Sequence, residues 1–271
     1  MSEIGSTNRL DYINKPFTNV ISNTEKNKPL KTDDSNKSYS IENLSLSKNA
    51  NSSKVKEVYS FADNDPDEWG DFFDNLYEKS EPEQFDMLTS MLAKKGGKIE
   101  TGSEQRNIIG FRFPTEIDAN KKRGHYDDVT AVFWKDKKGE KHVKLFESNT
   151  EPTSMFIGDR PNGDFGRIRS GKTYSFGISK TTLGDGQALR PNKELDIDRY
   201  DPKEKVFKPA SSSFQTEQTF LFHQGMVDNV FSMGCQTFKP KVWDEFMNTI
   251  KSDGADGKNQ KDIFYTILDV N

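Results

Sequence analysis

The feature that most constrains the fold is the uneven distribution of apolar residues along the chain. Residues 1–54 consist mainly of Asn, Ser, Lys, Thr and Asp, whereas residues 55–271 carry nearly all of the Trp, Phe and Tyr. A polar segment of this kind cannot bury enough apolar surface to offset the conformational entropy that it loses on ordering. We therefore expect a disordered polar leader over 1–54 and a folded core built from the remainder.

The composition narrows the functional class. The net charge is -4, with 39 basic and 43 acidic residues mixed along the chain, so no nucleic-acid footprint is visible. No run approaches the ~18 apolar residues of a membrane span. The N-terminus has no apolar signal region, so we expect synthesis in the cytoplasm without a Sec signal. One cysteine and three histidines without ligand spacing predict no disulfide, no metal and no cofactor.

Two helices are expected before residue 101. Asp65 followed by Pro66 is typical of a helix start. Ser80 and Glu83 have the spacing of a capping box at the start of a second helix. Apolar residues then recur at helical spacing in both segments, and a Gly-Gly pair at 96–97 ends the second. We predict a helical subdomain over 55–100.

From about residue 101 the pattern becomes alternating and β-like. Strands are expected near 108–113, 129–134, 142–147, 173–178, 219–223 and 263–268, with the loop 135–140 closing a hairpin. A single helix is expected from Pro240, where apolar residues return to helical spacing. The expected fold is therefore mainly β with helices (α+β), with one catalytic domain over 101–271.

The only cysteine, Cys235, ends the motif Ser-x-Gly-Cys at 232–235, twelve residues after His223. A neutral thiol is a poor nucleophile, and a neighbouring imidazole can accept its proton. We expect Gly234 to allow close approach of a substrate carbonyl, and backbone N–H groups around the cysteine to stabilise the oxyanion. Ser232 would shape the turn or assist the hydrogen bonding. The alternative interpretation is a buried structural cysteine and a satisfied core histidine.

Four further residues are predicted to bind substrate. Arg190 and Arg112 each offer a bidentate guanidinium that suits a substrate carboxylate. Gln236 directly follows Cys235, and Gly225 ends the His-x-Gly motif that begins at His223. The alternative for either arginine is a surface or packing role.

The string at 166–173 matches the P-loop expression GxxxxGK[ST]. A P-loop follows a buried strand and opens a helix whose N-terminus holds the phosphates. Here the preceding residues, 161–164, have the composition of a turn, and the following residues alternate as a strand does. We interpret the string as a turn that leads into a strand; nucleotide binding would require a helix over 171–180.

The ordered set of motifs resembles the L,D-transpeptidase (YkuD-type) catalytic domain, in particular phage and bacterial relatives with a His…SxGCQ motif. The matching stretches lie at 108–112, 126–128, 148–152, 168–177 and 188–191, followed by the His223 and Cys235 motifs. They span more than half of the chain. There are two departures: where the better-known transpeptidases usually carry His before Gly-Cys and Arg two residues after it, this chain has Met233 and Thr237.

The resemblance implies cysteine-dependent acyl transfer on an amide of a peptidoglycan stem peptide, with Cys235 as nucleophile and His223 as base. Water as acceptor would give an L,D-carboxypeptidase or endopeptidase, and an amine would give a transpeptidase. The polar leader suits an effector or toxin that uses secretion or injection machinery. Two alternatives stay open: a non-catalytic binding module on the same fold, and an injected cysteine protease or transferase that acts on host proteins.

Overall fold

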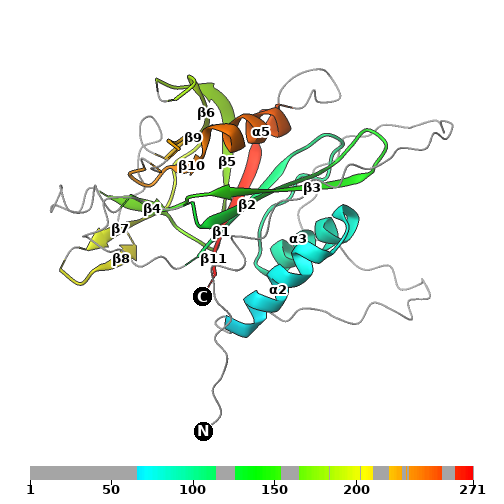
Figure 1. Ribbon diagram of the computed structural model, residues 1–271, viewed down its shortest axis with the longest axis horizontal. Coiled ribbons are helices and arrows are strands. Elements are labelled where there is room, and N and C mark those ends of the chain that lie inside the picture. The colour runs from blue at the N-terminus through cyan, green and yellow to red at the C-terminus, as the bar shows by residue number, and fades with distance from the viewer. Residues whose placement is uncertain are drawn as a thin grey trace, which may run out of the picture.

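The computed structural model describes residues 66–113, 126–153, 165–182, 184–201, 203–209, 220–227, 230, 232–251 and 260–270. The predicted leader over 1–54 and the predicted helix cap Asp65 lie outside these residues. The described part is mainly β, with an eight-stranded mixed sheet that nearly closes into a barrel, a second sheet of three strands, and three helices (Figure 1). The predicted class, β-rich with helices, is confirmed at this level.

The large sheet brings together strands that are far apart in the sequence. In spatial order its strands are β10 (Gln236–Phe238), β9 (Phe222–Gln224), β6 (Gln187–Pro191), β5 (Lys172–Lys180), β11 (Ile263–Asp269), β1 (Asn107–Arg112), β2 (Asp128–Lys135) and β3 (Lys141–Ser148). The small sheet has the order β4 (Gly166–Ile168), β7 (Ile197–Asp201) and β8 (Val206–Pro209). In the large sheet, β1 with β11 and β9 with β10 are parallel pairs; the other pairs are antiparallel.

The two edges of the large sheet meet through a single bridge. Asn149 follows β3, and its N–H and C=O bond to the O and N of Thr237 in β10, both at 2.8 Å. Such pairing satisfies backbone groups that an open edge would expose. The bridge therefore nearly closes the sheet and places the end of β3 beside β10.

Helix α5 (Pro240–Ile250) fills the interior of this sheet. Pro240 occupies its first turn, where the missing N–H costs nothing. Its buried side chains recur at helical spacing and pack against Phe222 and Phe238, next to β9 and β10 (Figure 1). They are Trp243, Phe246, Met247 and Ile250. The strands that carry the predicted thiol and imidazole motifs are thus supported from inside by an aromatic core.

Helices α2 (Pro66–Glu78) and α3 (Glu81–Lys94) cover the opposite, outer face of β1, β2 and β3 (Figure 1). The predicted capping box at the start of α3 is confirmed, because Ser80 N donates to Glu83 Oε2 at 3.1 Å. The apolar faces of both helices share one buried cluster with the outward side chains of the sheet, including Ile109, Phe111 and Phe133. No member of that cluster comes from β6, β9 or β10, so these two helices pack away from the strands of the candidate site.

Most expected strands are present with shifted ends, and five strands, β4, β6, β7, β8 and β10, were not assigned as strands from the sequence. The 135–140 hairpin loop is confirmed by Asp136 N donating to Glu140 O at 2.9 Å. The predicted turn leading into a strand is confirmed for 169–173, where a turn leads into β5, whereas 166–168 form the unpredicted strand β4. Residues 172–180 form a strand, so the helix that a P-loop requires is absent at this position.

Candidate functional site

The candidate site lies on the outward face of β9 and β10, which run parallel at one edge of the large sheet. Their register pairs Phe222 with Gln236 and His223 with Thr237. Side chains alternate along a strand, and Phe222 belongs to the interior cluster, so His223 and Thr237 face outward. Cys235 lies two residues before Thr237 and therefore faces the same side.

Cys235 and His223 are diagonal neighbours on this face. Gln236 N donates to Leu221 O at 2.8 Å, and the register places Cys235 opposite Leu221, two residues before His223. Residues with this offset on adjacent strands lie roughly 7–8 Å apart at their Cα atoms. A cysteine side chain and an imidazole that face the same way can bridge that span. The register therefore places the two predicted catalytic residues at neighbouring positions on one face.

Strand β6 completes the face. Ala188 packs with Leu221 and Cys235 in a small buried cluster. Arg190 lies two residues further along β6 and so faces the same side. Its Nε donates to Lys180 O at 3.2 Å. Of the two arginines predicted to bind a substrate carboxylate, Arg190 is the one that shares a face with Cys235.

The turn before Cys235 is held by Ser232. Ser232 Oγ donates to Cys235 O at 2.8 Å and accepts from Gly234 N at 3.0 Å. The Ser232 backbone is fixed as well, because its N donates to Thr153 Oγ1 at 2.8 Å and its O accepts from Thr153 N at 2.7 Å. These bonds make Ser232 the residue that shapes the turn, which was one of the two roles expected of it.

Gly234 is required by the shape of this turn. Its φ of +127° belongs to a region that side chains with a Cβ rarely adopt. A Cβ at this position would lie 2.1 Å from Gly166 O and 2.3 Å from Phe220 Cε1. The space that we expected a substrate carbonyl to approach is filled by the backbone of β4 and an aromatic ring, so Gly234 serves close packing here.

Burial sets the protonation of the thiol and the imidazole. Burial raises the pKa of Cys235 to about 11, and a hydrogen bond with the Leu221 backbone opposes this weakly. Burial also lowers the pKa of His223 below its ordinary value of 6.5. Both groups are therefore neutral at pH 7, and a proton must pass from sulfur to imidazole before a thiolate can attack.

The ring of His223 is fixed in the form that a base requires. Its Nδ1 lies 2.8 Å from Gln224 O. A carbonyl oxygen only accepts hydrogen bonds, so Nδ1 carries the proton. Nε2 is then unprotonated and can accept a proton from a neighbouring donor.

Gly225 continues the pairing of the two strands, because its N donates to Phe238 O at 2.8 Å. A Cβ on Gly225 would lie 2.2 Å from the hydroxyl oxygen of Tyr126, which donates to Met226 O at 2.7 Å. Burial raises the pKa of Tyr126 to about 12, so this hydroxyl keeps its proton at neutral pH. Met226 and Val227 are 54% and 69% exposed, which leaves two apolar side chains just after β9. Sequence reasoning missed Tyr126 as a neighbour of the site; its only signal was the 126–128 match.

Gln236 lies on the opposite face of β10 from Cys235. Its Nε2 donates to Gly234 O at 3.1 Å, and its Oε1 accepts from the Tyr265 hydroxyl at 2.9 Å. The side chain is buried and both ends of the amide are bonded within the protein. Gln236 therefore supports the cysteine turn from the interior, whereas the sequence had suggested a substrate contact.

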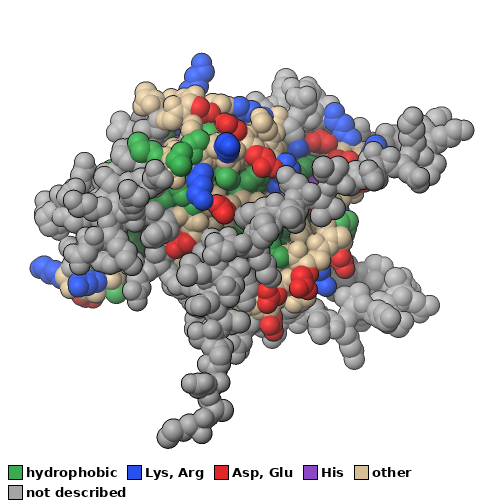
Figure 2. All heavy atoms as spheres, in the orientation of Figure 1, with side chains coloured by type: hydrophobic (Ala, Val, Ile, Leu, Met, Phe, Trp, Pro, Cys, Tyr) green, Lys and Arg blue, Asp and Glu red, His purple; other side chains and the backbone are tan. Residues whose placement is uncertain are grey.

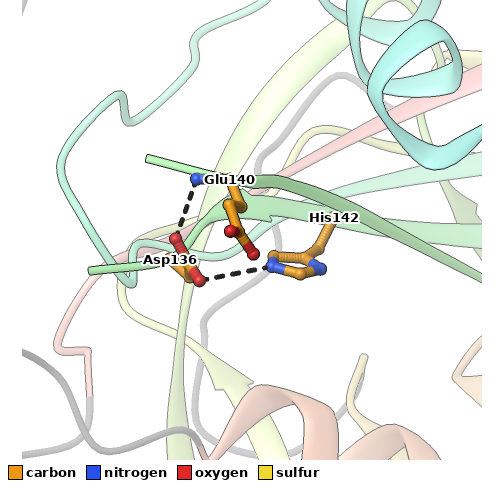
Figure 3. Close-up of side chains that lie close together, drawn as sticks. All are labelled: Asp136, Glu140 and His142. Atoms are coloured by element: carbon orange, nitrogen blue, oxygen red, sulfur yellow. Dashed lines mark hydrogen bonds and ion pairs between the residues drawn. The ribbon is translucent and has the colours of Figure 1, made fainter. Parts of the chain in front are cut away.

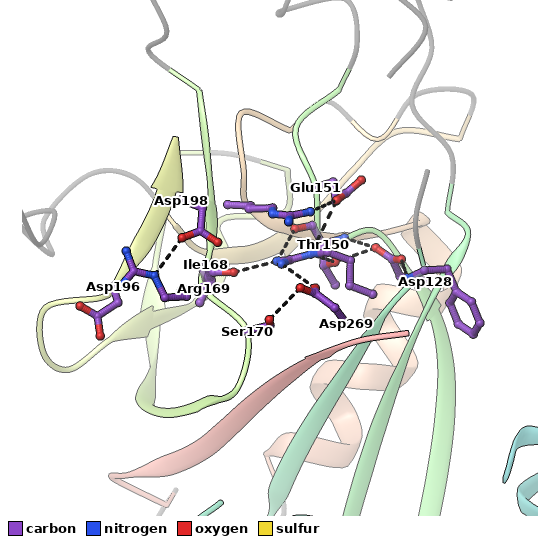
Figure 4. Close-up of polar contacts among 12 residues, drawn as sticks. Asp128, Thr150, Glu151, Ile168, Arg169, Ser170, Asp196, Asp198 and Asp269 are labelled. Atoms are coloured by element: carbon purple, nitrogen blue, oxygen red, sulfur yellow. Dashed lines mark hydrogen bonds and ion pairs between the residues drawn. The ribbon is translucent and has the colours of Figure 1, made fainter. Parts of the chain in front are cut away.

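Arg112, the second arginine predicted to bind substrate, is 1% exposed and surrounded by protein acceptors. Its Nε donates to Thr150 Oγ1 at 3.1 Å, and its Nη2 donates to Ile168 O at 2.9 Å. Its Nη1 pairs with Asp269 Oδ1 at 3.2 Å. Figure 4 shows these partners converging from separate elements. The guanidinium joins β1, β4, β11 and the segment after β3, which is the packing role named as its alternative.

Residues 149–153, which we call the strap, connect this buried network to the cysteine turn. At one end, Asp128 accepts from Thr150 N and Thr150 Oγ1, both at 2.7 Å (Figure 4). On the other side, Asn149 pairs with Thr237 and Thr153 bonds to Ser232. The strap thus holds the chain both before and after Cys235.

Buried charge surrounds the strap. Burial raises the pKa of Asp128, and the negative charges of Asp127 and Glu151 add to this, while hydrogen bonds from Thr150 and Phe113 oppose it. Burial likewise raises the pKa of Glu151. Arg167 Nη1 lies 2.6 Å from Glu151 Oε1. Hydrogen-bond donors therefore contact both acidic groups: Thr150 and Phe113 donate to Asp128, and Arg167 donates to Glu151.

A second cluster, at the tip of the β2–β3 hairpin, contains Asp136, Glu140 and His142, whose ligand atoms lie within 4.8 Å of one another (Figure 3). Asp136 Oδ1 accepts from the N–H groups of Lys138 and Glu140, each at 2.8 Å. His142 lies 3.6 Å from Asp136 and 3.2 Å from Glu81. These contacts are those of a hairpin turn docked on α3, so we assign no ligand to the cluster.

Charges of both signs are scattered over the described part of the visible surface. In Figure 2, Lys and Arg side chains are interspersed with Asp and Glu, and residues that are not described are grey. Lys144 with Glu245 and Lys141 with Asp86 are exposed pairs of this kind. Among the described residues, no helix combines the length and apolar composition needed to cross a bilayer.

No family model, curated protein or solved structure matches the chain. The chemistry of the site follows from its own geometry. That geometry provides a thiol and an unprotonated imidazole nitrogen on one face of two adjacent strands. Arg190 lies on the same side. The turn that carries the thiol is fixed by the hydrogen bonds of Ser232 to Thr153, Gly234 and Cys235.

Proposed function

We propose that the protein is a cysteine-dependent acyl transferase or peptidase that acts on an amide bond. The observation that carries this proposal is the register of β9 and β10, which puts Cys235 and His223 on one face as diagonal neighbours. The bond from His223 Nδ1 to Gln224 O supports it further, because it leaves Nε2 as an acceptor.

The reaction begins with transfer of the thiol proton from Cys235 to Nε2 of His223 as the sulfur attacks the amide carbonyl. This transfer is uphill in the resting site, because the pKa of the thiol is raised and that of the imidazole is lowered, so the proton moves only as the sulfur–carbon bond forms. The tetrahedral intermediate collapses to a thioester, and the proton on the imidazole passes to the leaving amine. Water or a second amine then releases the acyl group.

The proposed substrate is a peptidoglycan stem peptide, on the strength of the motif resemblance alone. Arg190 is the candidate for the substrate carboxylate, since its side of β6 is also the side of Cys235. Arg112 and Gln236 are not proposed as contacts, because protein groups already bond them on the interior side.

One observation favours a second candidate, a non-catalytic binding module. Cys235 is only 9% exposed and packs with Ala188 and Leu221, as a structural cysteine does. In that case the raised pKa of the thiol would reflect burial and no reactive role. The two candidates differ in whether Cys235 forms a bond with substrate.

The test is incubation of the wild type and Cys235→Ala with purified muropeptides, followed by mass spectrometry of the products. We expect new cleaved or cross-linked products with the wild type and none with Cys235→Ala. His142→Gln, a change on the distant hairpin, is the matched control and should behave as the wild type. Identical product profiles for wild type and Cys235→Ala would refute the proposal on this substrate class. Cys235-dependent cleavage of an unrelated protein would instead support the protease alternative.

A further inference from the structure

An acyl-transfer site needs a hydrogen-bond donor for the oxygen of the tetrahedral intermediate. The backbone N–H groups next to Cys235 are the nearest candidates. Gly234 N donates to Ser232 Oγ at 3.0 Å, and Gln236 N donates to Leu221 O at 2.8 Å. Both N–H groups that flank the cysteine are committed to holding the turn and the strand pair, so they cannot turn toward a substrate without breaking the fold locally.

Ser232 does not supply the donor either. Its hydroxyl proton goes to Cys235 O at 2.8 Å, where it closes the turn. The neighbouring side chain on β10, Gln236, faces the interior and bonds to Tyr265. A side chain on the outward face is therefore the place for a donor beyond the N–H of Cys235 itself.

Thr237 is such a side chain. It is 0% exposed, and its Oγ1 has no hydrogen-bond partner among the residues that the structure describes. It stands directly beside His223 in the register and follows Cys235 by two residues on the same face. Residues with that spacing along a strand are roughly 6.5 Å apart. An oxygen on a carbon bonded to the Cys235 sulfur can lie between the two side chains.

A buried hydroxyl without a partner destabilises a folded protein, and valine has the same shape without the hydroxyl. Other buried threonines of this sheet have partners: Thr130 Oγ1, also 0% exposed, donates to Ser148 Oγ at 2.8 Å. Thr237 differs in having its hydroxyl uncommitted next to a thiol and an imidazole. This arrangement is what a donor that meets its acceptor only during the reaction would require.

We propose that the Thr237 hydroxyl donates a hydrogen bond to the oxyanion formed when Cys235 attacks a carbonyl; this rests on the proposed acyl-transfer function. As the sulfur–carbon bond forms, the C=O electron pair moves to oxygen, and the thiol proton moves to His223 Nε2. The oxygen then accepts from Thr237 Oγ1–H. Collapse restores the C=O bond and expels the amine, which takes the proton from His223.

Two probes separate this role from others. A small acylamino aldehyde, N-acetyl-alaninal, adds the Cys235 sulfur reversibly and forms a tetrahedral carbon that bears an oxygen. Iodoacetamide alkylates the same sulfur by displacing iodide and forms no oxyanion. We expect Thr237→Val to weaken aldehyde capture by roughly 10²-fold, as for loss of one oxyanion donor. Iodoacetamide alkylation should be unchanged, and Thr237→Ser should restore aldehyde capture.

Thermal unfolding supplies an independent readout. Thr237→Val should melt at or above the wild-type temperature, because it removes an unpartnered hydroxyl. The matched variant Thr130→Val should melt lower, because it breaks a bond to Ser148. A lower melting temperature for Thr237→Val would mean that the hydroxyl already has a partner and would overturn the inference.

The remaining outcomes distinguish the proposed role of Thr237 from the proposed function. Equal aldehyde capture by wild type and Thr237→Val, with none by Cys235→Ala, would overturn the role of Thr237 and leave the proposed function standing. An equal loss with both probes would mean that Thr237 acts through His223, which also overturns the assignment. Wild-type capture no better than that of Cys235→Ala would contradict the proposed function itself.

Discussion

At the scale of single residues, burial controls the chemistry of the site. Cys235 and His223 are each surrounded by protein, and each is held in its neutral form. The folded protein therefore holds no thiolate–imidazolium pair before a substrate binds. Proton transfer must accompany attack on the substrate, which protects the thiol from side reactions until a substrate is bound.

Burial of the thiol predicts a dependence of stability on alkaline pH. The folded state keeps the Cys235 proton up to a pKa of about 11, compared with an ordinary value of 9.0. The resulting stability is fully present below pH 9 and is lost as the pH rises toward 11. Relative to Cys235→Ser, the wild type should lose about 2–3 kcal/mol of unfolding free energy across this range.

Urea unfolding at pH 8, 9, 10 and 11 measures this difference. Subtracting the curve of Cys235→Ser cancels the titration of the tyrosines, because both proteins carry the same ones. Parallel pH profiles for the two proteins would show that the thiol titrates equally in the folded and unfolded states, contrary to the burial described above.

The sequence predicted the chemistry of individual residues better than their surroundings. Cys235, His223 and Ser232 were identified from a motif, and the structure puts them at one turn and its partner strand. Arg112 was assigned to substrate because a guanidinium suits a carboxylate, and Gln236 because it follows the cysteine motif. Their burial depends on which strands lie behind them, and this long-range information is absent from a local pattern.

At the scale of elements, the cysteine turn depends on contacts from three directions. Gly166 of β4 packs against the cysteine turn, and the strap forms hydrogen bonds with it. Strand β9 pairs with β10, which follows the turn. Each contact is made by backbone or by short side chains, so the turn has little freedom to move. The position of Cys235 is consequently sensitive to changes in residues that do not touch it.

Gly234→Ala should be among the most damaging small changes in the protein. The new Cβ would meet Gly166 O at 2.1 Å on a backbone with φ of +127°. We expect a loss of about 3 kcal/mol or more in unfolding free energy. Gly139→Ala is the matched control, because Gly139 also has positive φ (+81°), but a Cβ there would meet nothing within 4 Å. Chemical denaturation of both variants checks this, and equal losses would contradict the packing argument.

Asp128→Asn should loosen the strap. One carboxylate oxygen of Asp128 accepts from Phe113 N, and the other accepts from Thr150 N and Oγ1. An amide in either orientation must aim its NH₂ at one of these N–H groups. We expect a loss of about 3 kcal/mol in unfolding free energy and slower alkylation of Cys235.

Asp136→Asn is the control for this change. A single oxygen of Asp136 accepts both of its backbone hydrogen bonds, so asparagine can keep them. Denaturant unfolding and iodoacetamide labelling measure the two effects. If Asp128→Asn left Cys235 labelling at the wild-type rate, the strap would have no part in positioning the thiol.

The elements that the sequence revealed are those with a strong local signal. The β2–β3 hairpin has alternating strands around a polar loop, and α5 has apolar residues at helical spacing after Pro240. Strands β4 and β10 have three residues each, too few for any periodicity. Their pairing is imposed by neighbours such as β7 and β9, which lie elsewhere in the sequence.

At the scale of the whole molecule, the large sheet has apolar cores on both sides. The interior cluster joins α5 to the strands, and the outer cluster joins α2 and α3 to β1, β2 and β3. Ile108 belongs to the first and Ile109 to the second, so consecutive residues of one strand tie the two together. The described helices and the sheet should therefore unfold as one unit.

Leu88→Ala tests this coupling. Leu88 is fully buried between α3 and the sheet, so its truncation should cost about 3 kcal/mol, within the range for buried leucines. Thiol labelling during urea unfolding measures the exposure of Cys235. The urea midpoint of this exposure should fall together with the midpoint for loss of the helical circular-dichroism signal. Separate transitions for these two signals would show that the helical pair folds independently of the sheet.

Near-closure of the sheet could not be predicted from the sequence. It depends on one bridge between Asn149 and Thr237, residues that are far apart in the sequence and whose local motifs do not indicate that they pair. The bridge matters for function because it brings the strap to β10. The pattern of apolar residues predicted the fold class, whereas closure of the sheet arises only when the whole chain folds.

The most direct test of the central claim is the rate at which iodoacetamide alkylates Cys235 as a function of pH. In the wild type the rate should rise with pH through an apparent pKa below 6.5, as His223 loses its proton. His223→Gln should lower the neutral-pH rate by roughly 10²-fold, while His142→Gln should match the wild type. Equal rates for wild type and His223→Gln across this range would contradict a thiol–imidazole pair at this site.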